Sequence, residues 1–275
     1  MDDYSPPNDL LTGRTILVTG AGDGIGRAAA LAYAAHGATV VLLGRTLAKL
    51  EAVYDAIEQA GGSTPALYPM NLEGARDKDY TELTQRLRTE FGSLEGILHN
   101  AAQLQLLSRI DDYDIETWYK VMQVNLNAPF MLTQACLPLL RKAEDASILF
   151  TSDRVGRTAK AYWGAYAVSK FGVEGLMQVL ADETRDSSAI RVNSIDPGPT
   201  RTPMRGQAYP GEDPRTLKTP EALMPLYLWL MGRDSIGTTG RAFDAAGPCL
   251  SEYSGEGAAP GDHAKSQISG TRRKI

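Results

Sequence analysis

A tyrosine and a lysine stand four residues apart in a stretch of helical period. Tyr166 and Lys170 lie in the run GAYAVSKFGVEG, so a helix places both side chains on one face. A free tyrosine has a pKa of about 10, which is too high for a general base at neutral pH, and a nearby ammonium stabilises the tyrosinate. The pair therefore predicts a proton-transfer site, although the same spacing also arises by chance on helix surfaces.

Three glycines near the start of the chain form a second candidate site. The segment TILVTGAGDGIGR carries Gly20, Gly24 and Gly26 between an apolar run and a helix expected to begin at about Ile25. This spacing is not G-x-G-x-x-G, but the physical requirement is shared: a tight turn, close backbone approach to a pyrophosphate, and a helix N-terminus facing the anion. The placement favours phosphate binding over a purely structural turn.

The end of the second apolar run indicates which dinucleotide fits. The run ends LLGRT, with Gly44 where an acid would bind the 2′-hydroxyl of NAD and Arg45 beside it, where an arginine accommodates the 2′-phosphate of NADP. Asp23 opposes that phosphate by its charge, and Arg45 could instead be an ordinary surface residue. We expect NADP, with NAD possible.

Short apolar runs alternate with longer stretches of helical period. The strand-like runs are Thr15–Thr19, Thr39–Leu43, Ala66–Met70, Gly96–His99, Ser147–Thr151 and Arg191–Ile195. The helix-like stretches are Gly26–His36, Leu47–Ala60, Asp79–Phe91, Ile115–Leu140 and Ala165–Arg185. Alternation of this kind predicts right-handed crossovers and a parallel sheet. The predicted fold class is α/β: a single-domain Rossmann fold with a doubly wound parallel sheet flanked by helices.

One domain accounts for most of the chain. We expect an N-terminal arm at 1–13, the dinucleotide-binding and catalytic domain at 14–246, and a flexible tail rich in Gly, Ser and Ala at 247–275. Residues 197–220 hold six prolines and no clear period, which is typical of a lid or binding loop.

The composition excludes several classes of protein. A net charge of −5 argues against a nucleic-acid partner, and no apolar run is long enough for a membrane span. Two cysteines are too few for a disulfide framework, so a reducing, cytoplasmic setting is expected. Three histidines and scattered acids predict no metal site.

Five motifs together resemble the short-chain dehydrogenase/reductase family over residues 14 to about 246. They are TGAGDGIG at 19–26, HNAA at 99–102, VNLNAPF at 124–130, YAVSK at 166–170 and DPGPTRT at 196–202, in the family's order and at about its spacing. The stretches GAYAVSKFGVEGLMQVLADE and LMPLYLWLMG look especially like the YciK-like bacterial branch, whose members are mostly uncharacterised oxidoreductases.

The resemblance implies roles for individual residues. Tyr166 would be the catalytic acid/base, and Lys170 would hold the nicotinamide ribose and lower the tyrosine pKa. Asn125 would help to anchor a water in a proton relay, where the alternative is a helix cap. Asn100 would lie near the adenosine ribose, unless it only forms a turn, and Thr202 near the nicotinamide. The implied cofactor-binding residues are Gly20, Asp23, Gly24, Ile25, Gly26, Arg45, Asn71, Asn100, Ala101, Tyr166, Lys170, Pro197, Gly198 and Thr202.

The pattern departs from the family at one catalytic position. The family has a serine thirteen residues before the tyrosine, which polarises the substrate carbonyl, and here that residue is Asp153. An ionised carboxylate only accepts hydrogen bonds and disfavours a nearby tyrosinate. Four outcomes stay open: Asp153 is protonated in a dry pocket, a loop shift brings Ser152 inward, carbonyl chemistry is impaired, or Asp153 forms a salt bridge to Arg154 or Arg157.

Smaller departures occur in the cofactor motifs. HNAA replaces the usual NNAG, so Ala102 adds a methyl group near the dinucleotide, and Asn71 stands where the family usually has an aspartate. His99 is expected to be a packing residue rather than a catalyst.

The resemblance implies an NAD(P)(H)-dependent oxidoreductase that interconverts a hydroxyl and a carbonyl group, as a homodimer or homotetramer. An apolar wall would suit a small hydrophobic alcohol or ketone; its expected residues are Leu104, Leu106, Val155, Tyr162, Trp163, Met204 and Tyr209. Because Asp153 replaces the serine, the alternative is a catalytically impaired protein that only binds the dinucleotide.

Overall fold

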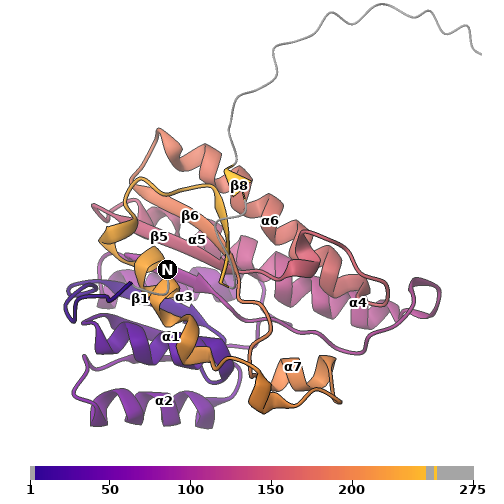
Figure 1. Cartoon of the computed structure of the whole chain (residues 1–275). Coiled ribbons are helices and arrows are strands. Elements are labelled where there is room, and N and C mark those ends of the chain that lie inside the picture. Colours follow the sequence, from indigo (N-terminus) through magenta and orange to yellow (C-terminus); the bar gives the residue numbers. More distant parts are fainter. Residues whose placement is uncertain (1–3, 246–250, 253–275) are drawn as a thin grey trace, which may run out of the picture.

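The structure, a computed structural model, describes residues 4–245 and 251–252 (Figure 1). One sheet runs through this part of the chain in the order β3-β2-β1-β4-β5-β6-β7-β8. The strands are β1 Thr15–Thr19, β2 Thr39–Gly44, β3 Ala66–Pro69, β4 Gly96–His99, β5 Ala146–Thr151, β6 Ile190–Asp196, β7 Arg241–Asp244 and β8 Ser251–Glu252. Strands β1 to β7 pair in parallel, and β8 pairs antiparallel with β7.

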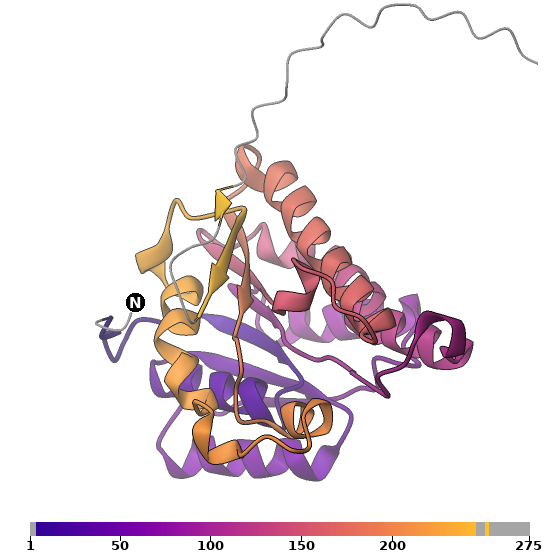
Figure 2. The ribbon, with the colours of Figure 1, turned by 45° about the vertical axis from the view of Figure 1, so that its right-hand side comes forward.

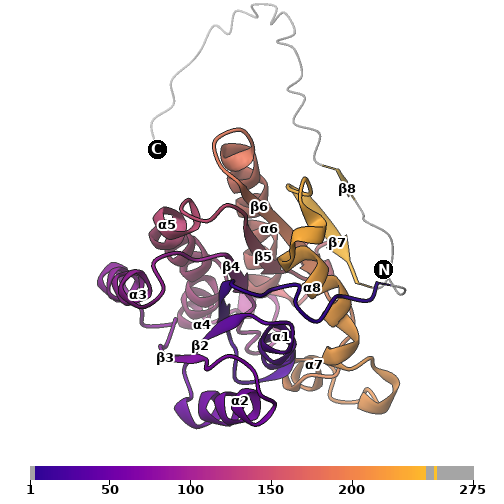
Figure 3. The same ribbon diagram turned by 90° about the vertical axis from the view of Figure 1, so that its left-hand side faces the viewer.

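Helices cover both faces of the sheet, which confirms the predicted Rossmann fold (Figure 3). One face carries α1 Gly24–Ala35, α2 Leu47–Gln59 and α8 Met224–Met231. The other carries α3 Asp77–Glu90, α4 Ile115–Met122, α5 Ala128–Leu140 and α6 Gly164–Arg185. Because both faces are covered, every residue of β1, β5 and β6 is buried, including the polar residues Arg191, Asn193 and Ser194 of β6.

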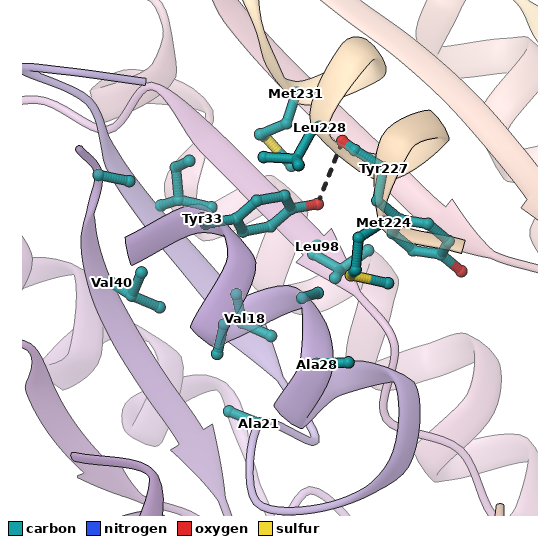
Figure 4. Close-up of a cluster of buried hydrophobic side chains, with 14 of the residues drawn as sticks. Val18, Ala21, Ala28, Tyr33, Val40, Leu98, Met224, Tyr227, Leu228 and Met231 are labelled. Atoms are coloured by element: carbon teal, nitrogen blue, oxygen red, sulfur yellow. Dashed lines mark hydrogen bonds between the residues drawn. The ribbon is translucent and has the colours of Figure 1, made fainter. Parts of the chain in front are cut away.

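A buried tyrosine fixes α1 against α8 and the sheet (Figure 4). The Tyr33 ring is fully buried among side chains that include Val18 and Leu98, and its hydroxyl donates a weak 3.5 Å hydrogen bond to the carbonyl oxygen of Tyr227. Burying a side chain of this size contributes about 1.5–3 kcal/mol. This packing holds α1 and α8 together on one face of the sheet.

The predicted helical stretch Ile115–Leu140 is interrupted. A π-helical segment, Gln123–Asn127, separates α4 from α5. Such segments hold one extra residue per turn and occur often at functional sites. The extra residue changes the helical face on which Asn125 lies, and the Asn125 side chain is buried.

Two α-helices and two strands lie outside the predicted set: α7 Pro203–Ala208, α8, β7 and β8. Helix α8 has the sequence MPLYLWLM and is apolar on almost every side, so it carries no amphipathic period. Helix α7 lies inside the proline-rich segment 197–220, where Thr202 caps its N-terminus. Figure 2 shows this segment in orange, with α7 beside α1.

The domain limits 14–246 stay a prediction, but residues of the expected arm pack on the domain. Leu11 is fully buried, and its N–H donates to the carbonyl oxygen of His36 at 2.9 Å. Most of the expected tail, 247–275, lies outside the described residues. Ser251–Glu252 is the exception, because it forms β8 rather than unstructured chain. Within the described ranges, no helix combines the length and apolar character that crossing a membrane requires.

Candidate active site

A cavity of about 990 Å³ opens at the carboxyl ends of the parallel strands. This is where open α/β sheets bind their ligands. The predicted site residues that line it are Gly20, Asp23, Gly24, Ile25, Arg45, Asn71, Asn100, Ala101, Ser152, Asp153, Tyr166, Lys170, Pro197, Gly198 and Thr202. The lining does not include Gly26 and Asn125, which lie behind the cavity wall.

The glycine turn between β1 and α1 is packed so closely against nearby backbone that side chains at Gly20 and Gly26 would not fit. Gly20 has a φ of +68°, and a Cβ atom there would stand 3.0 Å from the Cα of Ala101. A Cβ on Gly26 would collide with the carbonyl oxygen of Gly20. The turn leads directly into the N-terminus of α1, where unpaired N–H groups favour an anion. These residues fit the pyrophosphate of a dinucleotide.

A lysine at the start of α2 changes the electrostatics of this turn. Asp23 caps α1 by accepting from the Gly24 N–H at 2.8 Å, and its other carboxylate oxygen pairs with Lys49. The hydrogen bond from the Lys49 ammonium lowers the pKa of Asp23. The negative charge that opposes a 2′-phosphate is therefore matched by Lys49, and exposed Arg45 lines the same end of the cavity. Sequence reasoning missed Lys49, although it follows Arg45 by only four residues.

Hydrogen bonds at the strand ends fix two of the other predicted cofactor residues, Asn100 and Ala101. Thr19 Oγ1 accepts from the N–H groups of Asn100 and Ala101, each at 3.0 Å, so the ends of β1 and β4 are joined beside the glycine turn. Thr202 caps α7, and a Cβ atom on Gly24 would lie 3.3 Å from its methyl group. Asn71 is exposed and lines the cavity after β3, whose following residue Met70 donates its N–H to the Gly44 carbonyl oxygen.

At the other end of the cavity, the Tyr166 hydroxyl donates to Asp153. The distance between Tyr166 Oη and Asp153 Oδ2 is 3.1 Å, and Asp153 Oδ1 accepts from the Val155 N–H at 3.0 Å. Lys170 is on the same face of α6, with its Nζ 5.5 Å from the centre of the Tyr166 ring and 2.7 Å from the Thr151 carbonyl oxygen. The tyrosine, the lysine and the aspartate therefore form one hydrogen-bonded and electrostatic unit.

Burial and Asp153 raise the pKa of Tyr166, whereas the sequence suggested a lowered one. Burial raises it most, and the charge and hydrogen bond of Asp153 raise it further. Lys170 lies over the ring rather than at the hydroxyl, and burial lowers its own pKa to about 8. The expectation that the pKa of Tyr166 is lowered is wrong for this arrangement, because burial and Asp153 outweigh any effect of Lys170.

Of the alternatives for Asp153, the structure rules out the salt bridge. Arg157 pairs instead with Glu174 at 3.0 Å, and no ion pair of the described residues includes Arg154 or Asp153. Ser152 also lines the cavity, with its Oγ buried and without a partner in the described part of the chain. Asp153 is thus directed to the tyrosine.

Asn125 connects two elements behind the site. Its Oδ1 accepts from the Gln103 N–H at 2.7 Å, and its Nδ2 donates to the Gln103 carbonyl oxygen and to Ser169 Oγ. The side chain therefore clamps the segment after β4 to α6, and it is not a helix cap. Whether it also anchors a water stays a prediction.

Five of the seven expected wall residues line the cavity: Leu104, Val155, Trp163, Met204 and Tyr209. The prediction is wrong for Leu106 and Tyr162, which are 80% and 58% exposed and lie outside it.

Sequence reasoning missed Asp196, a buried acid that lines the cavity and accepts from the Gly198 N–H. Burial, and then the charges of Asp153 and Asp244, raise the pKa of Asp196. His99 is buried against Phe150, away from the cavity, as a packing residue.

Known proteins share both the sequence and this architecture. Residues 14–213 match the family model of the short-chain dehydrogenases. The chain is 52% identical to the uncharacterised oxidoreductase YciK of Escherichia coli, over 88% of this chain and 95% of that one. A short-chain dehydrogenase structure from Pseudomonas syringae has 56% identity and a TM-score of 0.87, covering 88% and 98% of the two chains.

A third relative carries a ligand. The structure of a short-chain dehydrogenase from Shigella flexneri, complexed with NADP, has 51% identity and a TM-score of 0.85, and covers 88% of this chain and all of that one. Family model, sequence and fold agree over the residues that build the cavity. The chain belongs to the short-chain dehydrogenase family, and it is an oxidoreductase of the YciK-like kind.

Proposed function

We propose that the protein is an NADP(H)-dependent oxidoreductase that interconverts a hydroxyl and a carbonyl group on a small, hydrophobic substrate. The observation that carries this proposal is that one cavity joins the glycine turn at one end to Tyr166 and Lys170 at the other. The walls beside Tyr166 include Trp163, Met204 and Tyr209. An apolar wall with few polar groups is typical of a site for a small hydrophobic ligand.

The cofactor would be held at its phosphates and at its 2′ end. The glycine turn and the N-terminus of α1 would bind the pyrophosphate. Arg45, with Lys49 neutralising Asp23, would favour the 2′-phosphate of NADP over the free hydroxyl of NAD. The NADP in the Shigella flexneri relative supports this preference.

Bound NADPH would supply a hydride to the substrate carbon. Tyr166 would donate its proton to the substrate oxygen, because its raised pKa keeps the phenol protonated at neutral pH. The Lys170 ammonium, close to the ring, would stabilise the phenolate that remains. Ser152, with its unpartnered Oγ at the wall, is a further hydroxyl that could orient the substrate oxygen.

Substitution of the tyrosine tests this function. With NADPH and a panel of hydrophobic ketones, Tyr166→Phe is expected to lose at least about a hundredfold in kcat/KM and to keep its affinity for NADPH, because only the proton donor is removed. Tyr162→Phe is the matched control, since this exposed tyrosine lies outside the cavity. Undiminished turnover by Tyr166→Phe contradicts the role. NADPH binding without any turnover in the wild type would favour the impaired-protein alternative.

A homodimer or homotetramer and a cytoplasmic location stay proposals. Exposed apolar side chains on α4, α5 and α6 support self-association; they include Ile115, Tyr119, Phe130, Val168 and Phe171. Sedimentation equilibrium of the wild type measures the association directly, and a monomer at high concentration would contradict it.

A further inference from the structure

The group beside the Tyr166 hydroxyl can only accept hydrogen bonds. Asp153 already accepts from Tyr166 Oη and from the Val155 N–H, and its half-buried carboxylate lines the cavity. A carbonyl oxygen is also only an acceptor, so its lone pairs would face those of Asp153. A reacting group that carries an N–H complements the carboxylate instead.

No ion pair of the described residues includes Asp153, and the charges of Lys170 and Arg205 act on it only at longer range. The nearby cations are engaged elsewhere: Arg157 pairs with Glu174, and Arg205 pairs with Glu212. Lys170 donates to the Thr151 carbonyl oxygen, and Lys160 donates to the Tyr209 hydroxyl. A carboxylate left unpaired at a partly buried position is complementary to a cationic ligand.

The surroundings strengthen this attraction. Asp196 adds a second acidic side chain to the same cavity, where it accepts the Gly198 N–H. The Trp163 ring lies 5.6 Å from the Tyr166 ring, and Met204 Sδ is 4.0 Å from Tyr166 Oη. Apolar walls lower the local dielectric, so a charge pair formed there is stronger than one in water.

We propose that this site also reduces iminium ions, the protonated form of C=N bonds, and oxidises the corresponding amines, with Asp153 binding the N–H of the reacting group. The inference rests on the proposed function for NADPH binding at the glycine turn. It goes further by assigning Asp153 a substrate of a different chemical class, a hydrophobic cyclic imine.

The step balances without an added proton donor. The iminium carbon accepts a hydride with its electron pair from the reduced nicotinamide, and a C–H bond forms. The π-electron pair of the C=N bond moves to the nitrogen, which becomes a neutral secondary amine that keeps its N–H. The substrate is reduced by two electrons and the cofactor is oxidised by two. Asp153 stays a carboxylate, and Tyr166 positions it through the hydrogen bond at 3.1 Å.

Two probes of matched shape test the assignment: dihydroisoquinoline, which is protonated to an iminium ion, and tetralone, the ketone of similar size. Both are assayed with NADPH, and their binding is measured by calorimetry on the complex with NADP⁺, where no hydride is available. The variants are Asp153→Asn, which removes the charge, and Asp153→Ser, which introduces a donor. Asp111→Asn is the matched control, because this acid pairs with Arg109 outside the cavity.

The wild type is expected to reduce dihydroisoquinoline at least about tenfold more efficiently than tetralone. Asp153→Asn is expected to weaken iminium binding at least about tenfold, because a charge-assisted hydrogen bond is lost, and to strengthen tetralone binding, because the amide can donate to the ketone oxygen. Asp153→Ser is expected to reverse the preference toward tetralone. Asp111→Asn is expected to change neither.

Two results overturn the inference: equal iminium binding by wild type and Asp153→Asn, or a wild type that prefers tetralone. Either result leaves the proposed function intact if the wild type reduces ketones and Tyr166→Phe loses that activity. Failure of NADPH to bind at all overturns the proposed function itself. NADPH affinity and circular dichroism show whether each variant is folded. The comparison of dihydroisoquinoline with tetralone on the wild type tests the inference even if a variant fails to fold.

Discussion

Asp153 lies 3.1 Å from the Tyr166 hydroxyl and precedes it by thirteen residues, so a carboxylate occupies the position at which the family has a serine. This contact has two effects. It raises the pKa of the tyrosine, together with burial, and it presents an acceptor to the substrate. The raised pKa keeps the phenol protonated at neutral pH, as the proposed role of proton donor requires.

Lys170 gives the fold a specific pH dependence. Burial lowers its pKa to about 8 from 10.5, so the unfolded chain binds more protons than the folded one between these values. The stability cost is fully present below about pH 8 and is relieved as the pH rises toward 10.5, by roughly 3 kcal/mol. Urea unfolding of wild type and Lys170→Met at about pH 7 and about pH 10 measures this. From pH 7 to pH 10 the free energy of unfolding of the wild type should rise relative to that of Lys170→Met. An equal difference between the two proteins at both pH values would contradict the lowered pKa of Lys170.

Arg45 is expected to select the cofactor. Arg45→Asp should weaken NADP binding by about ten- to a hundredfold, because a charge-assisted contact to the 2′-phosphate becomes a repulsion, and should change NAD binding little. Calorimetric titration with both dinucleotides measures the two affinities. Equal losses for NADP and NAD would remove the basis of the preference.

Lys49 is expected to act on NADP through Asp23. Lys49→Ala removes the partner of Asp23, so the unpaired carboxylate should repel the 2′-phosphate and weaken NADP binding. The double variant Lys49→Ala/Asp23→Asn should recover part of that affinity. The four proteins of this double-mutant cycle are compared by calorimetry at one salt concentration. Strictly additive effects would mean that the pair does not act as a unit.

A side chain at Gly26 is expected to be excluded by lack of space, whereas a side chain at Gly175 is expected to be tolerated. A Cβ atom on Gly26 meets the Gly20 carbonyl oxygen and the Asn100 amide, so Gly26→Ala should cost about 1–3 kcal/mol and weaken NADP binding. Gly175, in α6, has nothing within 4 Å of the same atom. Gly175→Ala should be neutral or stabilise by about 0.5–1 kcal/mol. Thermal unfolding of both variants decides, and equal destabilisation would contradict the steric argument.

The fold was largely predictable because buried strands leave a clear mark. Strands β1 to β6 begin and end within about two residues of the apolar runs, since strands covered on both faces are rich in apolar side chains. Helix α8 could not be found by period, because it is buried nearly all round. The π-helical segment also leaves no mark on the apolar pattern, so the interruption at Gln123–Asn127 could be seen only in the structure.

The residues of the site were easier to predict than their interactions. The motifs bring Tyr166, Lys170 and the glycine turn to one cavity, as their order along a parallel sheet requires. The direction of a side chain that leaves a strand end is not set by spacing. The bond from Tyr166 to Asp153 and the pairing of Lys49 with Asp23 therefore came only from the structure.

A crystal structure of the protein with NADP and dihydroisoquinoline tests the central claim most directly. We expect the pyrophosphate at the turn Gly20–Gly26, the 2′-phosphate at Arg45, and the nicotinamide facing the Tyr166 hydroxyl, with Asp153 on the substrate N–H. A Tyr166 hydroxyl turned away from the nicotinamide, or no dinucleotide at the glycine turn at saturating concentration, would contradict the account.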